Sequence, residues 1–272
     1  MTQFGMHDCD VCVIGSGAGG GPIAHTLSKA RRSVIVLEKG PWFREADFFK
    51  DEIADCRRNK FTPDVRKEPH VVELLEESGW ESYPTYDTGW NFWNGNMVGG
   101  ASNIMSGFFQ RLKPVDFRLR SEFGAIQDAD VRDWPINYDD LEPYYDRVEQ
   151  VVGISGRVIP HPQQEPRSKA DFPLPPLAEH PLANWIDEAG QRLGLNPVPL
   201  PRAILTIPRM GRVSCSYSHY CGNYGCATGA KGGSRAALLN DAIASGKCEI
   251  RPKSMVQRLE SDSRGQVIAA HY

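Results

Sequence analysis

The sequence predicts an α/β fold with a parallel central sheet into which further segments are inserted. The evidence is a pair of short apolar strands, at 10–14 and 33–38, with helical spacing of apolar residues across 22–30 between them. A strand, a helix and a second strand within about 30 residues form the unit from which parallel sheets are built. A chain of 272 residues is long enough for one large domain or two ordinary ones.

Later segments are expected to add helices and to return to the sheet. Helical patterns cover 138–152, 182–194 and 234–244, and strand patterns cover 248–251, 255–259 and 266–272, whereas 44–80 reads as a polar surface excursion. We therefore expect a first domain segment at 1–155, a proline-rich linker at 156–181, and a partial insertion with a return to the first domain at 182–272. Because the sequence stops on a strand with no cap, we expect it to end inside a domain.

Composition argues against several classes of protein. The net charge is −3, whereas a nucleic-acid-binding protein needs a basic face. No apolar run approaches the roughly 18 residues that a membrane span requires, and the first ten residues lack the basic start and apolar stretch of a signal peptide. We expect no nucleic-acid partner, no transmembrane segment and a cytoplasmic location, or periplasmic export through a partner subunit.

A glycine-rich motif directly follows the first strand and opens the first helix. It has the pattern G-x-G-x-x-G, in which the first glycine permits a tight turn, the second lets a pyrophosphate approach the backbone, and the third lets the helix pack on the sheet. The free N–H groups at the helix start attract phosphates. The sequence therefore predicts a Rossmann-like dinucleotide site at Gly15, Ser16, Gly17, Ala18 and Gly20.

Glu38, at the end of the second strand, completes this pattern. A carboxylate there accepts hydrogen bonds from the ribose hydroxyls of a dinucleotide and repels the 2′-phosphate of NADP, which leaves NAD and FAD open. The alternative is a glycine-rich turn in an unrelated α/β protein. It is disfavoured because the strand, the helix and the acid all occur where binding requires them.

A second group of motifs lies further along the chain, at 94–103 (NGNMVGGASN), 107–111 (GFFQR), 116–117 (DF) and 134–145 (WPINYDDLEPYY). In type and order they resemble the glucose–methanol–choline (GMC) family of FAD-dependent oxidoreductases, and within it the gluconate or sugar dehydrogenase-like branch. The resemblance covers nearly the whole chain. An NAD-dependent Rossmann enzyme, by contrast, leaves this group of motifs unexplained.

The resemblance implies FAD as the cofactor and a CH–OH group of a sugar, polyol or sugar acid as the hydride donor to flavin N5. Gly15, Gly17 and Gly20 resemble the pyrophosphate turn, and Glu38 the ribose ligand. The loop with Gly99, Gly100, Ser102 and Asn103 resembles the one whose backbone runs along the flavin, and Val256 the strand residue whose backbone meets the adenine.

In this family a histidine near the C-terminus takes the substrate's hydroxyl proton, with a second His or Asn beside it. Relatives carry these residues beyond position 272, and none of the seven histidines here lies in a matching context. We therefore assign no catalytic residue and expect the C-terminal substrate domain to be largely absent. The alternative is a catalytically silent or split FAD-binding module that needs a second polypeptide.

Cys215, Cys221 and Cys226 are closely spaced in a glycine-bearing segment. Such thiolates bind metals or iron–sulfur clusters, and the resemblance implies a three-iron cluster that passes electrons from flavin to a cytochrome or quinone. The last two cysteines are one residue further apart than in the tightest form of that motif. Zinc with His219 as fourth ligand, a disulfide plus a free thiol, and three inert cysteines are the alternatives.

Overall fold

The computed structural model describes residues 8–48, 61, 63–64, 66, 68, 70–85, 94–161, 164–218, 221–222 and 224–272. The chain divides into two compact units. Unit 1 comprises Met1–Ser106, Ser218–Gly229 and Gly233–Tyr272, and unit 2 comprises Gly107–Tyr217 and Ala230–Gly232. These boundaries differ from the expected division at 1–155, 156–181 and 182–272.

Unit 1 is built on a parallel three-stranded sheet in the order β1-β2-β5. The strands are β1 (Val11–Ile14), β2 (Val34–Leu37) and β5 (Cys248–Arg251). Ile14 pairs with Leu37 and Leu37 with Arg251, so the three strands end at one edge of the sheet. Every residue of the central strand β2 is buried, as its run of apolar residues predicts. The predicted α/β fold with a parallel sheet is confirmed.

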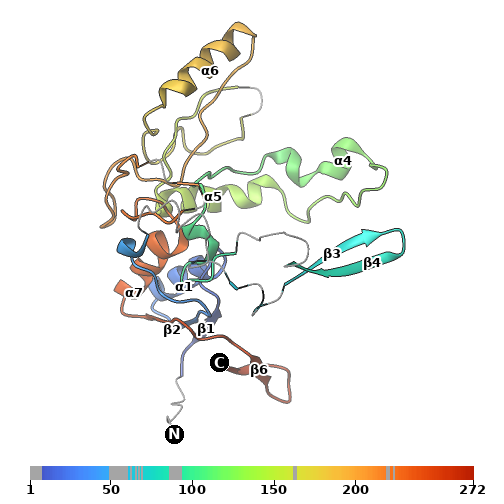
Figure 1. The fold of residues 1–272 in the computed structure, drawn as a ribbon, viewed down its shortest axis with the longest axis vertical. Coiled ribbons are helices and arrows are strands. Elements are labelled where there is room, and N and C mark those ends of the chain that lie inside the picture. Colours follow the sequence, from blue (N-terminus) through green and yellow to red (C-terminus); the bar gives the residue numbers. More distant parts are fainter. Residues whose placement is uncertain are drawn as a thin grey trace. The chain divides into compact units, whose positions relative to one another are not determined.

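In the part of unit 1 that the structure describes, two helical segments pack on this sheet. Helix α1 (Gly20–Lys29) connects β1 to β2, and a π-helical segment, η4 (Arg235–Leu239), continues into α7 (Asn240–Ala244) and leads to β5. Figure 1 shows α1 and α7 beside β1 and β2. The core that joins them consists of Val13, Ala24, Val34, Val36, Val98 and Leu239. The helix predicted at 234–244 is therefore present, but its first half has π-helical geometry.

The described residues of unit 1 also form two antiparallel hairpins and two short 3₁₀ turns. The hairpin of β3 (Val71–Glu76) and β4 (Gly79–Pro84) lies largely in the segment expected to be a polar excursion, and sequence analysis missed it. The second hairpin pairs β6 (Arg258–Ser261) with β7 (Val267–His271), which are the last two predicted strands, but β6 begins later than predicted. The turns are η1 (Glu45–Asp47) and η2 (Gly100–Asn103).

Unit 2 holds η3 (Pro114–Phe117), α4 (Leu119–Phe123), α5 (Tyr138–Val152) and α6 (Pro181–Arg192). A capping box at Asn137 and Asp140 starts α5. Residues 156–181 lie in this unit. Leu174 is only 2% exposed and bridges to Ser155, so at least this part of the proline-rich segment packs against the unit. None of the helices in the described ranges has the length and apolar content that a membrane crossing requires.

Candidate functional site

The predicted glycine motif lies between β1 and α1, at the edge where the parallel strands end. Gly15 has a left-handed φ of +84°, and its N–H donates to the Leu37 carbonyl at 2.8 Å. A Cβ at Gly20 would lie 2.0 Å from the Gly15 carbonyl oxygen, so only glycine lets the helix pack here. A Cβ at Gly17, in contrast, would meet no other atom within 4 Å. The backbone at Gly17 therefore borders open space that a ligand could fill.

The start of α1 offers hydrogen-bond donors to that space. The cap residue Gly19 has no side chain to satisfy the first turn, and this turn contains no acidic residue. Among the described residues, the N–H groups of Gly17, Ala18 and Gly19 have no protein acceptor. These groups and the positive end of the helix dipole favour an anion such as a phosphate.

Glu38 lies against the glycine motif, as its position after β2 predicted. The side chain is almost fully buried. Its Oε2 accepts from the Ser16 N–H at 2.9 Å and the Ser16 hydroxyl at 2.6 Å, and its Oε1 accepts from the Gly40 N–H at 2.8 Å. The contact of the Ser16 hydroxyl was not predicted from the sequence. Because a carboxylate oxygen has two lone pairs, Oε1 retains the capacity to accept one further hydrogen bond.

The second predicted loop lies directly on the glycine motif. The Gly99 N–H donates to the Ser16 hydroxyl at 2.8 Å, and a Cβ at Gly100 would lie 3.0 Å from the Gly17 Cα. Both Gly99 and Gly100 have left-handed backbones, with φ of +93° and +58°. The buried Asn103 donates to the carbonyls of Val98 and Gly100, at 2.8 and 3.2 Å. Its side chain thus holds the loop in shape.

A third segment, which sequence analysis missed, joins these two loops. The Ser234 hydroxyl donates to the Ser16 carbonyl at 2.8 Å, and the Ser234 N–H donates to the Ser102 hydroxyl at 2.8 Å. Ser102 in turn donates to the Gly99 carbonyl at 2.6 Å. A Cβ at Gly21 would lie 1.9 Å from the Ser234 hydroxyl oxygen, so α1 and the start of η4 are in close contact. The Gly232-Gly233 pair ahead of a helical pattern was the available signal.

A buried cation lies beside the same loop. The Arg235 guanidinium is 4% exposed and pairs with Glu45, with an Nη2–Oε1 distance of 2.8 Å. Burial raises the pKa of Glu45, but its hydrogen bond and ion pair with Arg235 outweigh this effect and leave the pKa below its usual value. A Cβ at Gly99 would lie 2.8 Å from the Arg235 Cβ. The loop of Gly99–Asn103 thus contacts the first turn of η4.

Val256 is half-buried and precedes β6, outside the strand in which it was predicted. Its segment nevertheless passes close to Glu38. The Ser254 N–H donates to the Glu38 carbonyl at 2.8 Å, and the Lys253 N–H donates to the Gly40 carbonyl at 3.0 Å. The contact predicted between Val256 and an adenine stays a prediction.

The three predicted metal-ligating cysteines are all partly buried. Cys215 belongs to unit 2, whereas Cys221 and Cys226 belong to unit 1. The Cys215 sulfur accepts from the Tyr217 N–H at 3.3 Å, and the Cys226 sulfur lies 3.4 Å from the Thr228 hydroxyl. No three His, Cys, Asp or Glu side chains within the described ranges form a group that could hold a metal. The zinc ligand suggested in the alternative, His219, lies outside the described residues.

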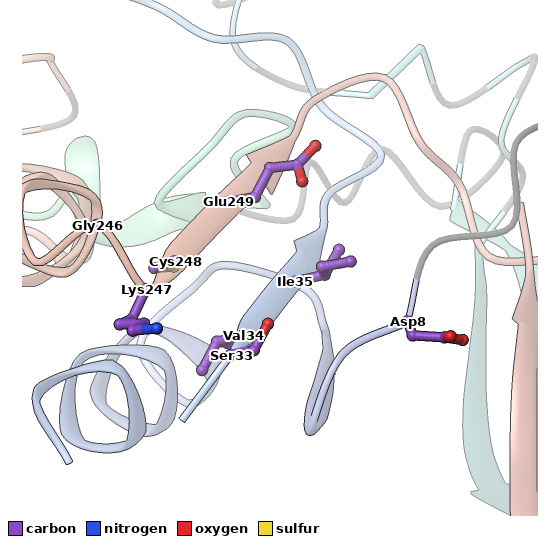
Figure 2. A pocket seen from close by; sticks show the side chains of 8 residues that line it. All are labelled: Asp8, Ser33, Val34, Ile35, Gly246, Lys247, Cys248 and Glu249. Atoms are coloured by element: carbon purple, nitrogen blue, oxygen red, sulfur yellow. The ribbon is translucent and has the colours of Figure 1, made fainter. Parts of the chain in front are cut away.

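A hollow of about 500 Å³ lies elsewhere in unit 1, and Figure 2 shows it from close by. It lies where β2 and β5 begin. Ligands of parallel sheets bind where the strands end, at the opposite edge. This hollow is therefore not the candidate site. Its lining residues are Asp8, Ser33, Val34, Ile35, Gly246, Lys247, Cys248 and Glu249.

Comparison with known proteins finds similar sequences, although no protein-family model matches the chain. The 6′′′-hydroxyparomomycin C oxidase of Streptomyces lividus is 33% identical over 96% of this chain and 43% of its own length. The 2-methyl-1,2-propanediol dehydrogenase of Mycolicibacterium austroafricanum is 36% identical over 75% of this chain and 34% of its own length. The gluconate 2-dehydrogenase flavoprotein of Pantoea cypripedii is 26% identical over 92% of this chain and 45% of its own length. The chain thus spans less than half the length of these relatives.

Solved structures share the fold. Pyridoxine 4-oxidase from Mesorbium loti matches with a TM-score of 0.53 and 20% identity, over 97% of this chain and 45% of that one. An FAD-dependent oxidoreductase from Chaetomium thermophilum matches with a TM-score of 0.57 and 17% identity, over 97% of this chain and 41% of that one. The two groups of motifs, the parallel sheet that carries the first of them and these relatives agree: the chain belongs to the glucose–methanol–choline oxidoreductase family.

Proposed function

We propose that this chain forms the FAD-binding part of an oxidoreductase that oxidises a CH–OH group to a carbonyl. The observation that carries the proposal is the convergence of three predicted features in unit 1. The glycine motif at 15–20, the buried carboxylate of Glu38 and the loop of Gly99–Asn103 are joined by direct hydrogen bonds through Ser16. This matches the order of groups in FAD, with the adenosine ribose at Glu38, the pyrophosphate at the glycine motif and the flavin at the loop.

The residues fit FAD in three respects. The open space beside Gly17 and the N–H groups of Gly17, Ala18 and Gly19 suit a pyrophosphate. The remaining capacity of Glu38 Oε1 suits a ribose hydroxyl. The left-handed glycines 99 and 100 let the main chain approach a flat ring. When bound, FAD supplies the hydride acceptor at its flavin N5, and the chain supplies binding and orientation.

An alcohol, polyol, sugar or sugar acid is the proposed substrate. The relatives' names, which include a diol dehydrogenase and a gluconate dehydrogenase, support this class. We assign no proton acceptor to the chain. Of the described histidines, His25 pairs with Asp241, His180 caps α6, and His271 bonds to Glu260. The family resemblance puts the acceptor in the portion that the relatives carry beyond the matched segment.

The first test is the absorption spectrum of the purified protein, followed by anaerobic reduction with a panel of polyols, aldoses and aldonic acids. We expect flavin bands that bleach with at least one member of the panel. A colourless protein that FAD fails to reconstitute would overturn the proposal.

The silent or split module is distinguished by the same experiment. Such a module keeps the flavin bands but is reduced by no member of the panel, even when reduction with dithionite is complete. The names of the relatives, which are oxidases and dehydrogenases, support the enzyme over this alternative.

The electron acceptor is proposed to be a cytochrome or quinone. The resemblance to the sugar dehydrogenase branch supports this, and an iron–sulfur cluster on Cys215, Cys221 and Cys226 stays a prediction from spacing. The arrangement of the described residues does not support it. Iron and acid-labile sulfide analysis tests the cluster, and turnover with a soluble quinone compared with oxygen tests the acceptor.

A further inference from the structure

Ser16 is buried at the point where the ribose side and the flavin side of the proposed site meet. Its side chain is 0% exposed. Its hydroxyl donates to Glu38 Oε2 at 2.6 Å and accepts from the Gly99 N–H at 2.8 Å, and its carbonyl accepts from the Ser234 hydroxyl at 2.8 Å. One side chain therefore bridges two residues that lie 22 and 83 positions further along the chain.

The direction of this bridge is fixed by chemistry. An ionised carboxylate only accepts hydrogen bonds and a backbone N–H only donates them, so the hydroxyl proton must point to Glu38 and a lone pair to Gly99. The 2.6 Å contact has the length of a hydroxyl donating to a charged oxygen. In a buried chain of this kind each bond polarises the next. A change at Glu38 is therefore transmitted through Ser16 to the Gly99 amide.

We propose that Ser16 is a positioning residue that couples occupancy of the ribose subsite at Glu38 to the conformation of the loop Gly99–Asn103. A hydroxyl bound at Glu38 restrains the carboxylate, which restrains the Ser16 hydroxyl, which in turn restrains the loop through its Gly99 amide. The adenosine half of FAD then prepares the loop for the flavin half. This inference rests on the proposed function, because it requires a dinucleotide at this site.

The test uses ADP and the protein purified at its full encoded length without FAD. ADP carries the ribose and pyrophosphate but no flavin. Amide hydrogen exchange of the peptide spanning 97–104 is followed with and without saturating ADP in the parent protein and in Ser16→Ala. We expect ADP to slow exchange of this peptide in the parent. In Ser16→Ala this protection is lost, and the Gly99 amide exchanges at least about fivefold faster because it has lost its buried acceptor.

Ser28→Ala is the matched control. Ser28 is also 0% exposed and lies on α1, but its hydroxyl donates within the same helix, to the His25 carbonyl at 3.0 Å. The control should respond to ADP as the parent does. If Ser16→Ala does not fold, Ser16→Cys serves instead, because a thiol keeps the shape but is a weak donor and acceptor.

The outcomes separate the two proposals. ADP protection of 97–104 that is as strong in Ser16→Ala as in the parent would mean that the ligand orders the loop directly, and would overturn the coupling alone. A parent protein that binds neither ADP nor FAD by calorimetry would overturn the dinucleotide site and the coupling together. Loss of protection in Ser16→Ala with ADP still bound would support both.

Discussion

Gly17 and Gly20 lie within one turn of chain, yet they are required for different reasons. A Cβ at Gly20 would meet the Gly15 carbonyl oxygen at 2.0 Å, whereas a Cβ at Gly17 would meet no protein atom within 4 Å. Gly20 is therefore required by the fold, whereas Gly17 is required only if a ligand occupies the space beside it. Substitutions separate the two requirements.

Gly17→Val should abolish flavin retention, because its branched side chain fills the space proposed for the pyrophosphate, while stability changes by less than about 0.5 kcal/mol. Gly20→Ala should instead lower the free energy of unfolding by about 1–3 kcal/mol through overpacking. Flavin content of the purified variants and urea unfolding without FAD measure the two effects. Full flavin occupancy in Gly17→Val would contradict the assignment of the glycine motif.

At the scale of elements, α5 is held in unit 2 by a buried ionic network. The Glu149 carboxylate, 2% exposed, receives two bonds from Arg111, at 2.7 and 2.9 Å, and a third from Arg167. Burial lowers the pKa of Arg111, but its bonds to Glu149, Tyr138 and Glu142 outweigh this effect and raise the pKa above its ordinary value. Arg111 therefore stays charged, and removing Glu149 takes away the carboxylate that makes two of its hydrogen bonds and leaves this buried cation only partly compensated, by Glu142.

Glu149→Gln should therefore lower the free energy of unfolding by about 3–5 kcal/mol, the range found when one member of a buried ion pair is removed. Glu188→Gln is the matched control, because Glu188 forms an exposed pair with Arg192 on α6 and should change stability by no more than about 0.5 kcal/mol. Urea unfolding followed by tryptophan fluorescence measures both. Equal, small changes would mean that the network does not stabilise the unit.

Contact between α1 and α7 should make stability depend on pH. Asp241 bonds to His25 at 2.8 Å and to Lys29 at 3.1 Å. Burial raises the pKa of Asp241, but these bonds outweigh it and lower the pKa below the ordinary value. A carboxyl group whose pKa is lower in the folded state stabilises the protein above its unfolded pKa. That stability is lost as the pH falls through the folded pKa.

Asp241→Asn should therefore lower the free energy of unfolding by about 1 kcal/mol at neutral pH, a small value because the pair is partly exposed. At a pH below the folded pKa of Asp241, the difference from the parent should vanish. Thermal unfolding between pH 7 and pH 2.5 measures this convergence. Two stability curves that stay parallel over the whole range would argue against the pair.

For the molecule as a whole, the sequence predicted elements whose pattern is local. The apolar run of β2 and the helical spacings of α1 and α5 were sufficient, because β2 is wholly buried and each of these two helices buries residues on one face. Helix α6 was also predicted from its spacing, although none of its residues is buried. The hairpin at Val71–Glu76 and Gly79–Pro84 was missed because its mostly exposed strands do not alternate apolar and polar residues along the chain. The π-helical geometry of η4 depends on tertiary packing, which the spacing of apolar residues along the sequence does not predict.

The candidate site was predictable where a motif is contiguous and not where distant segments meet. Gly15–Gly20, Glu38 and the loop of Gly99–Asn103 each have a sequence pattern. The contact of Ser234 with Ser16 joins residues 218 positions apart and has none. The hydroxyl of Ser16 was likewise unremarkable in sequence, because a serine within a glycine motif is an ordinary turn residue.

The last prediction follows from the unit in which the proposed FAD-binding residues lie. The predicted FAD-binding residues all lie in unit 1. A ligand that binds only the folded protein stabilises it by about 2.7 kcal/mol at a concentration of 100 times its Kd. We expect FAD at this concentration to slow amide exchange in β1, α1 and β2 by an amount that corresponds to this stabilisation. If the two units open separately, amide exchange in α5 of unit 2 should not change. Hydrogen exchange at several FAD concentrations measures both responses. Protection of α5 without protection of α1 would place the cofactor in unit 2, and the proposed site at Gly15–Gly20 and Glu38 would then be wrong.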